Sequence, residues 1–526
     1  MAVEDWRPMR QACLDAIDDL APGRSPKMPE YEEFLRWLEA DHFTFLGHRR
    51  YRYADDPDSP SGLRYELLPG SALGILRRDE VRLFDEGVGG GEAMARFARG
   101  TDNILIVKTD RRAPVVVSMV WYKVGSVDEV NGATGVAHVL EHMLFKGTKE
   151  IPGGDFSKIV AAAGGRDNAF TSRDYTGYFQ TIQKSQLPLM LKMEADRMVN
   201  ALIPPDEFAK EIKVIQEERR WRTDDRPRSL VYEQLMATAL RAHPYRIPTV
   251  GWMNDLENMT AEDARDFYNK WYAPNNATLV VVGDVSHDEV FKLAEQHFGP
   301  HKPKTLPPRK PQDEPAQTGI RRITVKAPAE QPYLLMAYRA PRLVDAEKDW
   351  EPYALDMLAS VLDGNDAARF SRELIRGTQI ASGADASYDG VGRGPGFFYL
   401  TGVPTAGKTL DELEKALRRE VQKVIDDGVT DDELKRIKAQ VTASRVYERD
   451  SMFFQARQIG SLEVIGFSHK TIDVMTERFK AVTADQVRAV AKKYLIDDAL
   501  TVAYLDPQPV GDKKPAAPPA GLRHAQ

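Results

Sequence analysis

The stretch His138-Val139-Leu140-Glu141-His142 places two imidazoles and a carboxylate within five residues of the chain. Residues three or four apart lie on the same side of an α-helix, so both histidines can reach one ion while Glu141 lies beside them. Apolar residues on both sides of the stretch predict a buried helix, and Gly147 is a typical stop signal just past it. The pattern is typical of a hydrolytic zinc site, although a buried helix with two core histidines has the same spacing.

A third ligand has to come from elsewhere in the chain, because a catalytic zinc ion usually takes three protein ligands and leaves one position for water. The segment 207–219 predicts a second helix that carries several glutamates. Glu211 and Glu218 are seven residues apart, two turns along one face, whereas Glu217 points elsewhere. One of the first two can therefore bind the metal while the other orients a metal-binding histidine from behind.

The order His-x-x-Glu-His is the inverted zinc motif of the inverzincins. It is followed by the Glu-x6-Glu segment and accompanied by Arg112-Ala113-Pro114-Val115-Val116-Val117 and Asn168-Ala169-Phe170-Thr171. With these motifs, residues 100–508 resemble the pitrilysin/insulinase family of metallopeptidases, in particular the bacterial members that are similar to mitochondrial processing peptidase.

The resemblance implies a zinc metalloendopeptidase with one Zn²⁺ per chain. It would hydrolyse peptides or unfolded segments through a metal-activated water, and the backbone of a strand edge would pair with the extended substrate. The residues implied are His138, His142 and Glu218 as metal ligands, Glu141 as the catalytic general base, Glu211 as a supporting catalytic carboxylate, and Asn168, Ala169, Phe170 and Arg376 as substrate contacts. Asn168 also fits a turn residue before a strand, and Arg376 fits a solvated charge at a helix end.

The resemblance also implies a partner. Active assemblies of the family present an Arg and a Tyr from a zinc-less domain, in a segment resembling Arg-Gly-Leu-Ala-Tyr-Ser. The matching stretch here, residues 376–382, has the Arg but no Tyr. We therefore expect a homodimer, or a heterodimer with a zinc-less homologous subunit that supplies the missing groups. The alternative function is a non-catalytic, processing-peptidase-like interaction subunit, but such relatives typically lose the metal ligands that this chain has kept.

An internal repeat lies in the second half of the chain. Aligning residues 135–144 with residues 353–362 keeps the apolar register and replaces both histidines and Glu141. Likewise Glu211 falls on Arg436, and Glu218 on Ala443. The repeat predicts an α+β fold with two homologous sheet-plus-helices units, processing-peptidase-like, preceded by a small α/β N-terminal segment. Expected elements include strands within 113–124 and 277–283 and helices within 187–198 and 410–427.

Two flexible stretches, Gly87-Val88-Gly89-Gly90-Gly91 and a proline-dense run from Pro300, divide the chain. Residues 1–86 resemble an N-terminal fragment of large bacterial NAD-dependent glutamate dehydrogenases without their catalytic region, so this part is either an accessory domain or the product of a fused reading frame. The predicted parts are an accessory N-terminal segment (1–86), a Gly-rich linker (87–99), a zinc-bearing peptidase domain (100–299), a Pro-rich linker (300–318), a zinc-less repeat domain (319–506) and a disordered tail (507–526).

Composition narrows the function classes. The 526 residues carry a net charge of −7 with both signs interspersed, which gives no indication of nucleic-acid binding. The single cysteine, Cys13, excludes an intramolecular disulfide and a structural cysteine-zinc cluster. No apolar run reaches the roughly 18 residues of a membrane span. Acidic residues stand where a secretory signal would be basic, so we expect a cytoplasmic chain, or a periplasmic one if the N-terminus is mis-assigned or fused.

Overall fold

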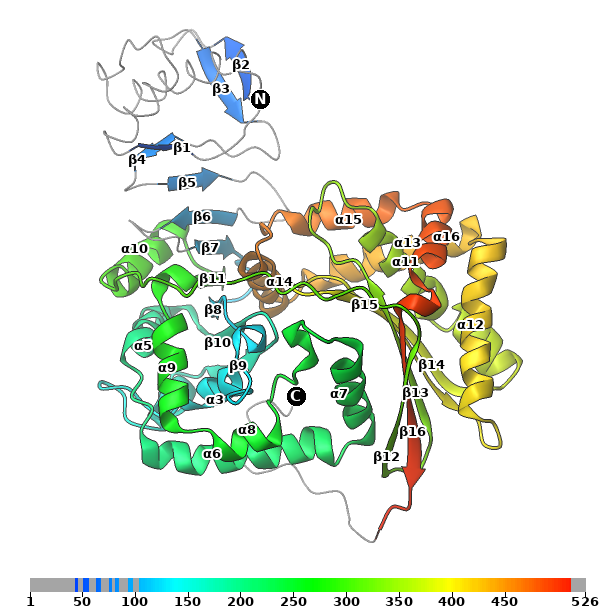
Figure 1. Cartoon of the computed structure of the whole chain (residues 1–526). Coiled ribbons are helices and arrows are strands. Elements are labelled where there is room, and N and C mark those ends of the chain that lie inside the picture. Colours follow the sequence, from blue (N-terminus) through cyan, green and yellow to red (C-terminus); the bar gives the residue numbers. More distant parts are fainter. Residues whose placement is uncertain are drawn as a thin grey trace.

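The computed structural model describes residues 104–511 throughout, and of residues 1–103 it describes only the backbone of six short strands (Figure 1). The segment 1–86 that was compared with glutamate dehydrogenases therefore lies almost wholly outside the described residues, as does the predicted tail from residue 512.

The first half of the chain holds a mixed sheet with the strand order β5-β6-β7-β11-β8-β10-β9. β7 and β11 are parallel, and the remaining pairs are antiparallel. One of its strands, β6, lies within the range predicted as a Gly-rich linker. The strands are β5 (Val81–Phe84), β6 (Ala93–Phe97), β7 (Ile104–Thr109), β8 (Val115–Tyr122), β9 (Arg166–Thr171), β10 (Thr176–Gln183) and β11 (Ala277–Gly283).

The second half repeats this topology with the order β12-β16-β13-β15-β14. Here β12 and β16 are parallel and the other pairs antiparallel, so each strand has a counterpart in the part of the first sheet from β7 to β9. The predicted fold of two homologous sheet-plus-helices units is confirmed. The strands are β12 (Arg321–Pro328), β13 (Tyr333–Ala340), β14 (Ala381–Asp389), β15 (Gly396–Pro404) and β16 (Leu500–Gln508).

The helices pack on the sheets in two corresponding sets. Those of the first half are α3 (Val136–Met143), α4 (Asp155–Ala162), α5 (Leu187–Asn200), α6 (Pro205–Arg219), α7 (Pro227–Ala239), α8 (Met253–Asn258), α9 (Ala261–Trp271) and α10 (His287–Phe298). Those of the second half are α11 (Glu351–Asp363), α12 (Leu410–Asp427), α13 (Asp431–Glu448), α14 (Met452–Ile465), α15 (Thr471–Ala481) and α16 (Ala484–Tyr494). The helix expected within 410–427 has those bounds, where Thr409 and Glu412 form a capping box.

The two halves exchange one helix each. On β8, Val116, Val120 and Tyr122 face the helices of their own half, whereas the alternate residues face α14 from the second half. The second sheet repeats the arrangement, because one face of β13 packs on α11 and α12, and the other packs on α7 from the first half. Figure 1 shows α7 and α12 on opposite sides of this sheet. Both central strands are therefore buried on both faces, as their continuous apolar runs indicate.

Polar contacts join the halves as well. Arg393, in the loop between β14 and β15, donates to both carboxylate oxygens of Asp128 at 2.9 and 3.0 Å. The backbone amide of Arg393 donates to Asp174 at 3.0 Å, and the Tyr245 hydroxyl is 2.6 Å from each oxygen of the same carboxylate. The ends of two corresponding strand hairpins thus meet across the boundary.

The last strand, β16, runs further than predicted. It pairs with β12 up to Gln508, which lies opposite Pro328, so the first two residues of the range predicted as a disordered tail belong to the sheet. Among the described residues, no helix is both long enough and apolar enough to cross a membrane.

The helix exchange makes a stability prediction at Gly460, in the middle of α14. A Cβ atom there would lie 2.1 Å from the indole nitrogen of Trp121 on β8. We expect Gly460→Ala to destabilise the protein, because a buried clash of this kind typically costs about 1–3 kcal/mol, which exceeds the gain of about 1 kcal/mol from helix propensity. Thermal unfolding followed by circular dichroism measures the effect.

The matched control is Gly383→Ala on β14, where an added Cβ meets nothing within 4 Å. Its unfolding midpoint should stay close to that of the parent. Equal midpoints for the two variants would contradict the close approach of α14 to the first sheet.

Candidate metal centre

The N-terminus of α3 is fixed by two carboxylates. Glu129 accepts hydrogen bonds from the amides of Gly135 at 2.8 Å and Ala137 at 2.9 Å, which are among the amides left unpaired at a helix start. Asp255 accepts from the amide and the hydroxyl of Thr134 at 3.1 and 2.6 Å. All eight residues of α3 are buried, so the predicted helix is confirmed and its side chains have little freedom to move.

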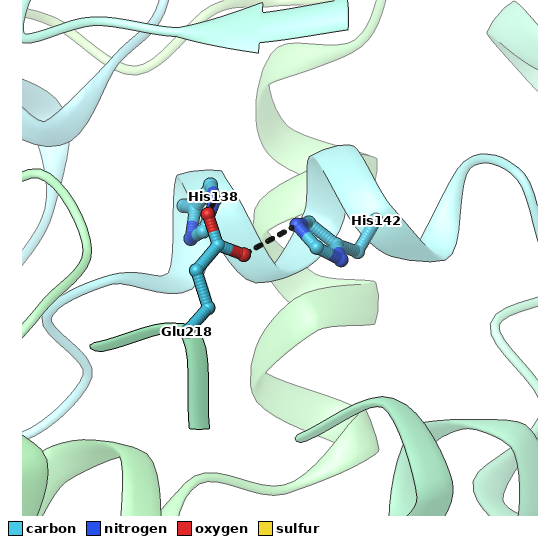
Figure 2. A group of neighbouring side chains, drawn as sticks. All are labelled: His138, His142 and Glu218. Carbon is cyan, nitrogen blue, oxygen red and sulfur yellow. Dashed lines mark ion pairs between the residues drawn. The ribbon is translucent and has the colours of Figure 1, made fainter. Parts of the chain in front are cut away.

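The structure brings three of the predicted residues together. His138 and His142 lie one turn apart on α3, and Glu218, near the end of α6, reaches between them (Figure 2). The Glu218 carboxylate is 3.7 Å from Nε2 of His138 and 3.4 Å from Nε2 of His142. One nitrogen or oxygen from each residue lies within 4.8 Å of the others. Among the described residues, this is the one group of His, Cys, Asp and Glu side chains that is arranged to hold a metal ion.

The chemistry and spacing of these donors fit a tetrahedral metal. Ligand atoms about 2.0–2.2 Å from a tetrahedral zinc ion are about 3.3–3.6 Å apart. The separation of 3.4 Å between Glu218 and His142 lies within this range, and that of 3.7 Å between Glu218 and His138 lies just above it. Two imidazoles and one carboxylate are the donor set of several catalytic zinc sites. The three residues are almost completely buried, with exposed fractions of 4% for His138, 2% for His142 and 0% for Glu218. An ion that they held would therefore be largely shielded from solvent.

Glu211 lies behind the cluster and contacts it through His142. Its carboxylate is 2.8 Å from Nδ1 of His142, and it forms an ion pair with Lys146. A carboxylate accepts a hydrogen bond, so Nδ1 of His142 carries the hydrogen of this contact and Nε2 is the atom left for a metal ion. The structure therefore places Glu211 where it orients His142, and not within the group that could hold an ion.

The electrostatics of the cluster favour a cation. Burial alone would lower the pKa of His142, but hydrogen bonds to Glu211 and Glu218 outweigh it and raise the pKa to about 9. Burial would raise the pKa of Glu218, yet its contacts with His142, His138 and Arg222 lower that pKa to about 2. Both shifts have the same origin, because the glutamates gathered around the two imidazoles stabilise positive charge.

Glu141 is buried beside the two histidines, with 1% of its surface exposed. Its carboxylate accepts a hydrogen bond of 2.5 Å from the hydroxyl of Thr171, the last residue of β9. Thr171 is the final residue of the Asn-Ala-Phe-Thr motif, and its side chain ties the edge strand to the helix that carries the histidines.

β9 is the last strand of the first sheet. One of its edges pairs with β10, and no described strand pairs with the other. Asn168 lies inside this strand and not in a turn before it, which overturns the turn interpretation. Ala169 is buried in the main core. The partly buried Phe170 ring packs on the other face of the sheet, with its centre 5.0 Å from that of Trp121.

The remaining predicted residues lie apart from the cluster. Arg376, at the end of the π-helical turn η7 (Phe370–Gly377), donates to the carbonyl of Asp366 in its own half. Among the described contacts, none joins it to the metal cluster. Tyr388, the first tyrosine after the segment 376–382, donates its hydroxyl to the carbonyl of Pro341 at 2.5 Å. His243 is buried and accepts from the amide of Tyr245.

Sequence reasoning missed two contacts at the centre. Arg222, in the π-helical turn η4 (Arg220–Asp224), places Nε 2.9 Å from the Glu218 carboxylate. Its position four residues after Glu218 is the signal that could have identified it, because such a pair lies on one helix face. The bond between Thr171 and Glu141 spans 30 residues and has no comparable signal in the sequence.

Comparisons with known proteins cover both halves of the chain. Residues 105–251 match the family model described as insulinase (peptidase family M16), and residues 258–441 match the one described as peptidase M16 inactive domain. The second match runs from the end of α8 in the first half to α13 in the second, and it includes none of the residues of the metal cluster. The resemblance of residues 1–86 to glutamate dehydrogenases is not borne out by these comparisons, whose family matches begin at residue 105.

Among individual proteins, the zinc protease PqqE of Helicobacter pylori is 31% identical over 407 residues, which are 77% of this chain and 90% of that protein. The crystal structure of a protease from Helicobacter pylori superposes with a TM-score of 0.74 at 29% identity, over 80% of this chain and all of that one. The periplasmic protease PqqL of Escherichia coli shares the fold, with a TM-score of 0.68 at 18% identity, over 83% of this chain but 48% of that one. The chain therefore belongs to the M16, or insulinase, family of peptidases.

Proposed function

We propose that the protein is a zinc-dependent endopeptidase that hydrolyses peptides or unfolded segments. The observation that carries the proposal is the joint placement of a complete metal-binding group, His138, His142 and Glu218, with a buried carboxylate, Glu141, beside it. The name of the PqqE relative supports zinc as the ion.

When bound, zinc supplies the Lewis acidity that makes water a nucleophile near neutral pH. Glu141 takes the proton from the attacking water and later delivers it to the leaving amine. The hydroxyl of Thr171 donates to one oxygen of Glu141 and so fixes the orientation of the carboxylate. Glu211 performs the corresponding task for His142 by fixing its tautomer.

Substrate binding uses the free edge of β9. An extended peptide can add as a further strand there, because the backbone groups on the outer side of β9 have no neighbouring strand among the described residues. Asn168, Ala169 and Phe170 would contribute backbone groups to this pairing. Backbone pairing selects extended or unfolded segments and tolerates many side chains.

Removing a proposed ligand should remove the metal. We expect the purified chain to hold about one zinc per chain, and His138→Ala or His142→Ala to abolish that binding, because two remaining protein ligands seldom hold a catalytic zinc. Metal analysis after dialysis measures the occupancy. His297→Ala, on α10 and away from the cluster, is the control and should keep its zinc. Full occupancy in both α3 variants would refute the ligand assignment.

Replacing the proposed base separates metal binding from turnover. Glu141→Gln keeps the shape of the side chain but cannot accept the proton, so zinc should stay bound while peptide turnover falls by about 10²–10⁴-fold. Glu217→Gln, at an exposed position on α6, should hydrolyse peptides at the parent rate. If Glu141→Gln turned over like the parent, another group would be the base.

We extend the proposal to a two-subunit assembly, either a homodimer or a heterodimer with a zinc-less homologue. The chain matches 48% of PqqL, and a crystal structure of the first half of that protein has the same fold with a TM-score of 0.67, so one unit of this fold makes up about half of that longer protein. Within this chain, Arg376 and Tyr388 are engaged with carbonyl groups of their own half. Donors for the oxyanion of the reaction would then come from a second subunit, and the loss of one such donor typically costs a hundredfold or more in rate.

The assembly is tested by measuring turnover per chain over a range of concentrations, with the mass in solution from size-exclusion chromatography. Turnover per chain should rise as dimers form, or on addition of a zinc-less homologue that carries the Arg and the Tyr. High turnover by a strict monomer that the homologue leaves unchanged would rule out a required partner. The alternative, a non-catalytic interaction subunit, predicts partner binding without turnover in either arm.

A further inference from the structure

A cavity of about 390 Å³ lies beside the metal centre. It is bounded by η4, by α7 and by the segment 245–250, which includes the short turn η5 (Pro244–Arg246). Its walls carry four guanidinium groups and a single carboxylate. The charged residues are Arg173, Arg222, Arg228, Arg246 and Glu233.

The single carboxylate does not neutralise the cavity. Glu233 is committed to Arg219, which is outside the lining, through two hydrogen bonds of 2.8 and 2.9 Å. Arg228 stacks over the ring of Tyr333 at 4.8 Å, and an aromatic ring leaves its charge in place. Arg173 is paired with Asp389 at 3.7 Å and Arg222 with Glu218 at 2.9 Å. Neither Arg228 nor Arg246 forms an ion pair with a carboxylate in the part of the chain that the structure describes. The uncompensated positive charge of the cavity therefore lies at these two residues.

Two wall residues connect the cavity directly to the proposed reaction site. The Nε atom of Arg222 is 2.9 Å from the Glu218 carboxylate that completes the metal-binding group. Arg173 follows Thr171 by two residues, so a peptide paired along β9 that continues past Thr171 reaches the cavity wall. The Arg173 side chain is held in place by the hydroxyl of Tyr232 at 2.5 Å. The position of the cavity suits a substrate side chain near the scissile bond.

We infer that this cavity is a substrate subsite that binds a carboxylate, with Arg228 and Arg246 as its recognition groups. The inference rests on the proposed peptidase function and names the substrate class of that site. Guanidinium groups bind carboxylates through pairs of parallel hydrogen bonds, and they do so most strongly where water is partly excluded. The carboxylate belongs to an internal Asp or Glu, or to the C-terminus of a short peptide, and the experiment separates these two sources.

The test measures binding in a Glu141→Gln background, where turnover is blocked and the zinc-loaded protein is intact. Fluorescent peptides of one sequence carry Glu, Gln or Lys at successive positions, each with a free or an amidated C-terminus. We expect at least one Glu position to bind roughly 10- to 100-fold more tightly than Gln, in line with hydrogen bonds between charged groups. Dependence on the free C-terminus instead would assign the subsite to that carboxylate.

Charge reversal then locates the effect. Arg246→Glu and Arg228→Glu should each remove the preference for the carboxylate and favour the Lys peptide. Arg419→Glu, at an exposed position on α12, is the matched control and should leave the preference unchanged. Zinc content and the unfolding midpoint are measured for each variant. If a charge reversal does not fold, the Gln variant at the same position, Arg246→Gln or Arg228→Gln, replaces it.

The possible results separate this inference from the proposed function. Equal binding of Glu, Gln and Lys peptides with either C-terminus, or a preference that survives substitution of both arginines, would overturn the carboxylate subsite. A parent protein that binds acidic peptides in this manner but hydrolyses none of them would overturn the peptidase function and leave the subsite standing. Turnover without any carboxylate preference would overturn the subsite and leave the peptidase function standing.

Discussion

The exchange of α7 and α14 between the halves is the constraint on which the metal centre depends. α6, which carries Glu211 and Glu218, runs through η4 directly into α7, and α7 is packed on the second sheet. Arg219 reinforces this path by bonding to Glu233 on α7 and to the carbonyl of Gly251. The second half therefore contributes, together with the packing of α6 on α3, to where Glu218 lies relative to the histidines.

The second half also holds the end of β9, on the side of the site where Glu141 lies. Asp174, three residues beyond Thr171, receives the backbone amide of Arg393 and the hydroxyl of Tyr245. These bonds fix the end of β9, from which Thr171 reaches Glu141 and along which a substrate would pair. The proposed base and the third ligand thus approach α3 from two directions, and both are positioned by contacts with the second half. A rigid arrangement of this kind keeps reacting groups within the small tolerances that catalysis requires.

Much of the architecture was predictable because its determinants are local. The spacing of His138, Glu141 and His142 requires only a helix, and the apolar register of residues 353–362 revealed the repeat. The choice of Glu218 over Glu211 as the third ligand needed the family resemblance, since both lie on one helix face. The bond from Thr171 to Glu141 was not predictable, because no periodicity relates a strand end to a helix 30 residues earlier.

The helix exchange was hidden for a different reason. An amphipathic helix shows that one face is buried, but its sequence does not state which sheet covers that face. The sequence of α7 is equally compatible with packing on the first sheet and with packing on the second. A glycine at position 460 is a partial signal, because a glycine inside a helix often marks a close approach, here to Trp121. Phe170 gives a further example, since its sequence does not indicate that its ring packs beside Trp121 on the face of the sheet that α14 covers.

The zinc-less half indicates why the first half carries its buried glutamates and histidines. α11 follows β13 and packs against α13, just as α3 follows β8 and packs against α6, although Asp356 and Ser360 replace the histidines. Burial raises the pKa of Asp356. Among the described residues, the second half thus forms the same pair of helices without a metal-binding group. Burying three glutamates and two histidines in the first half is costly unless they are paired, and stability of the fold does not require it. The metal binding and hydrolysis proposed for these residues would account for their presence.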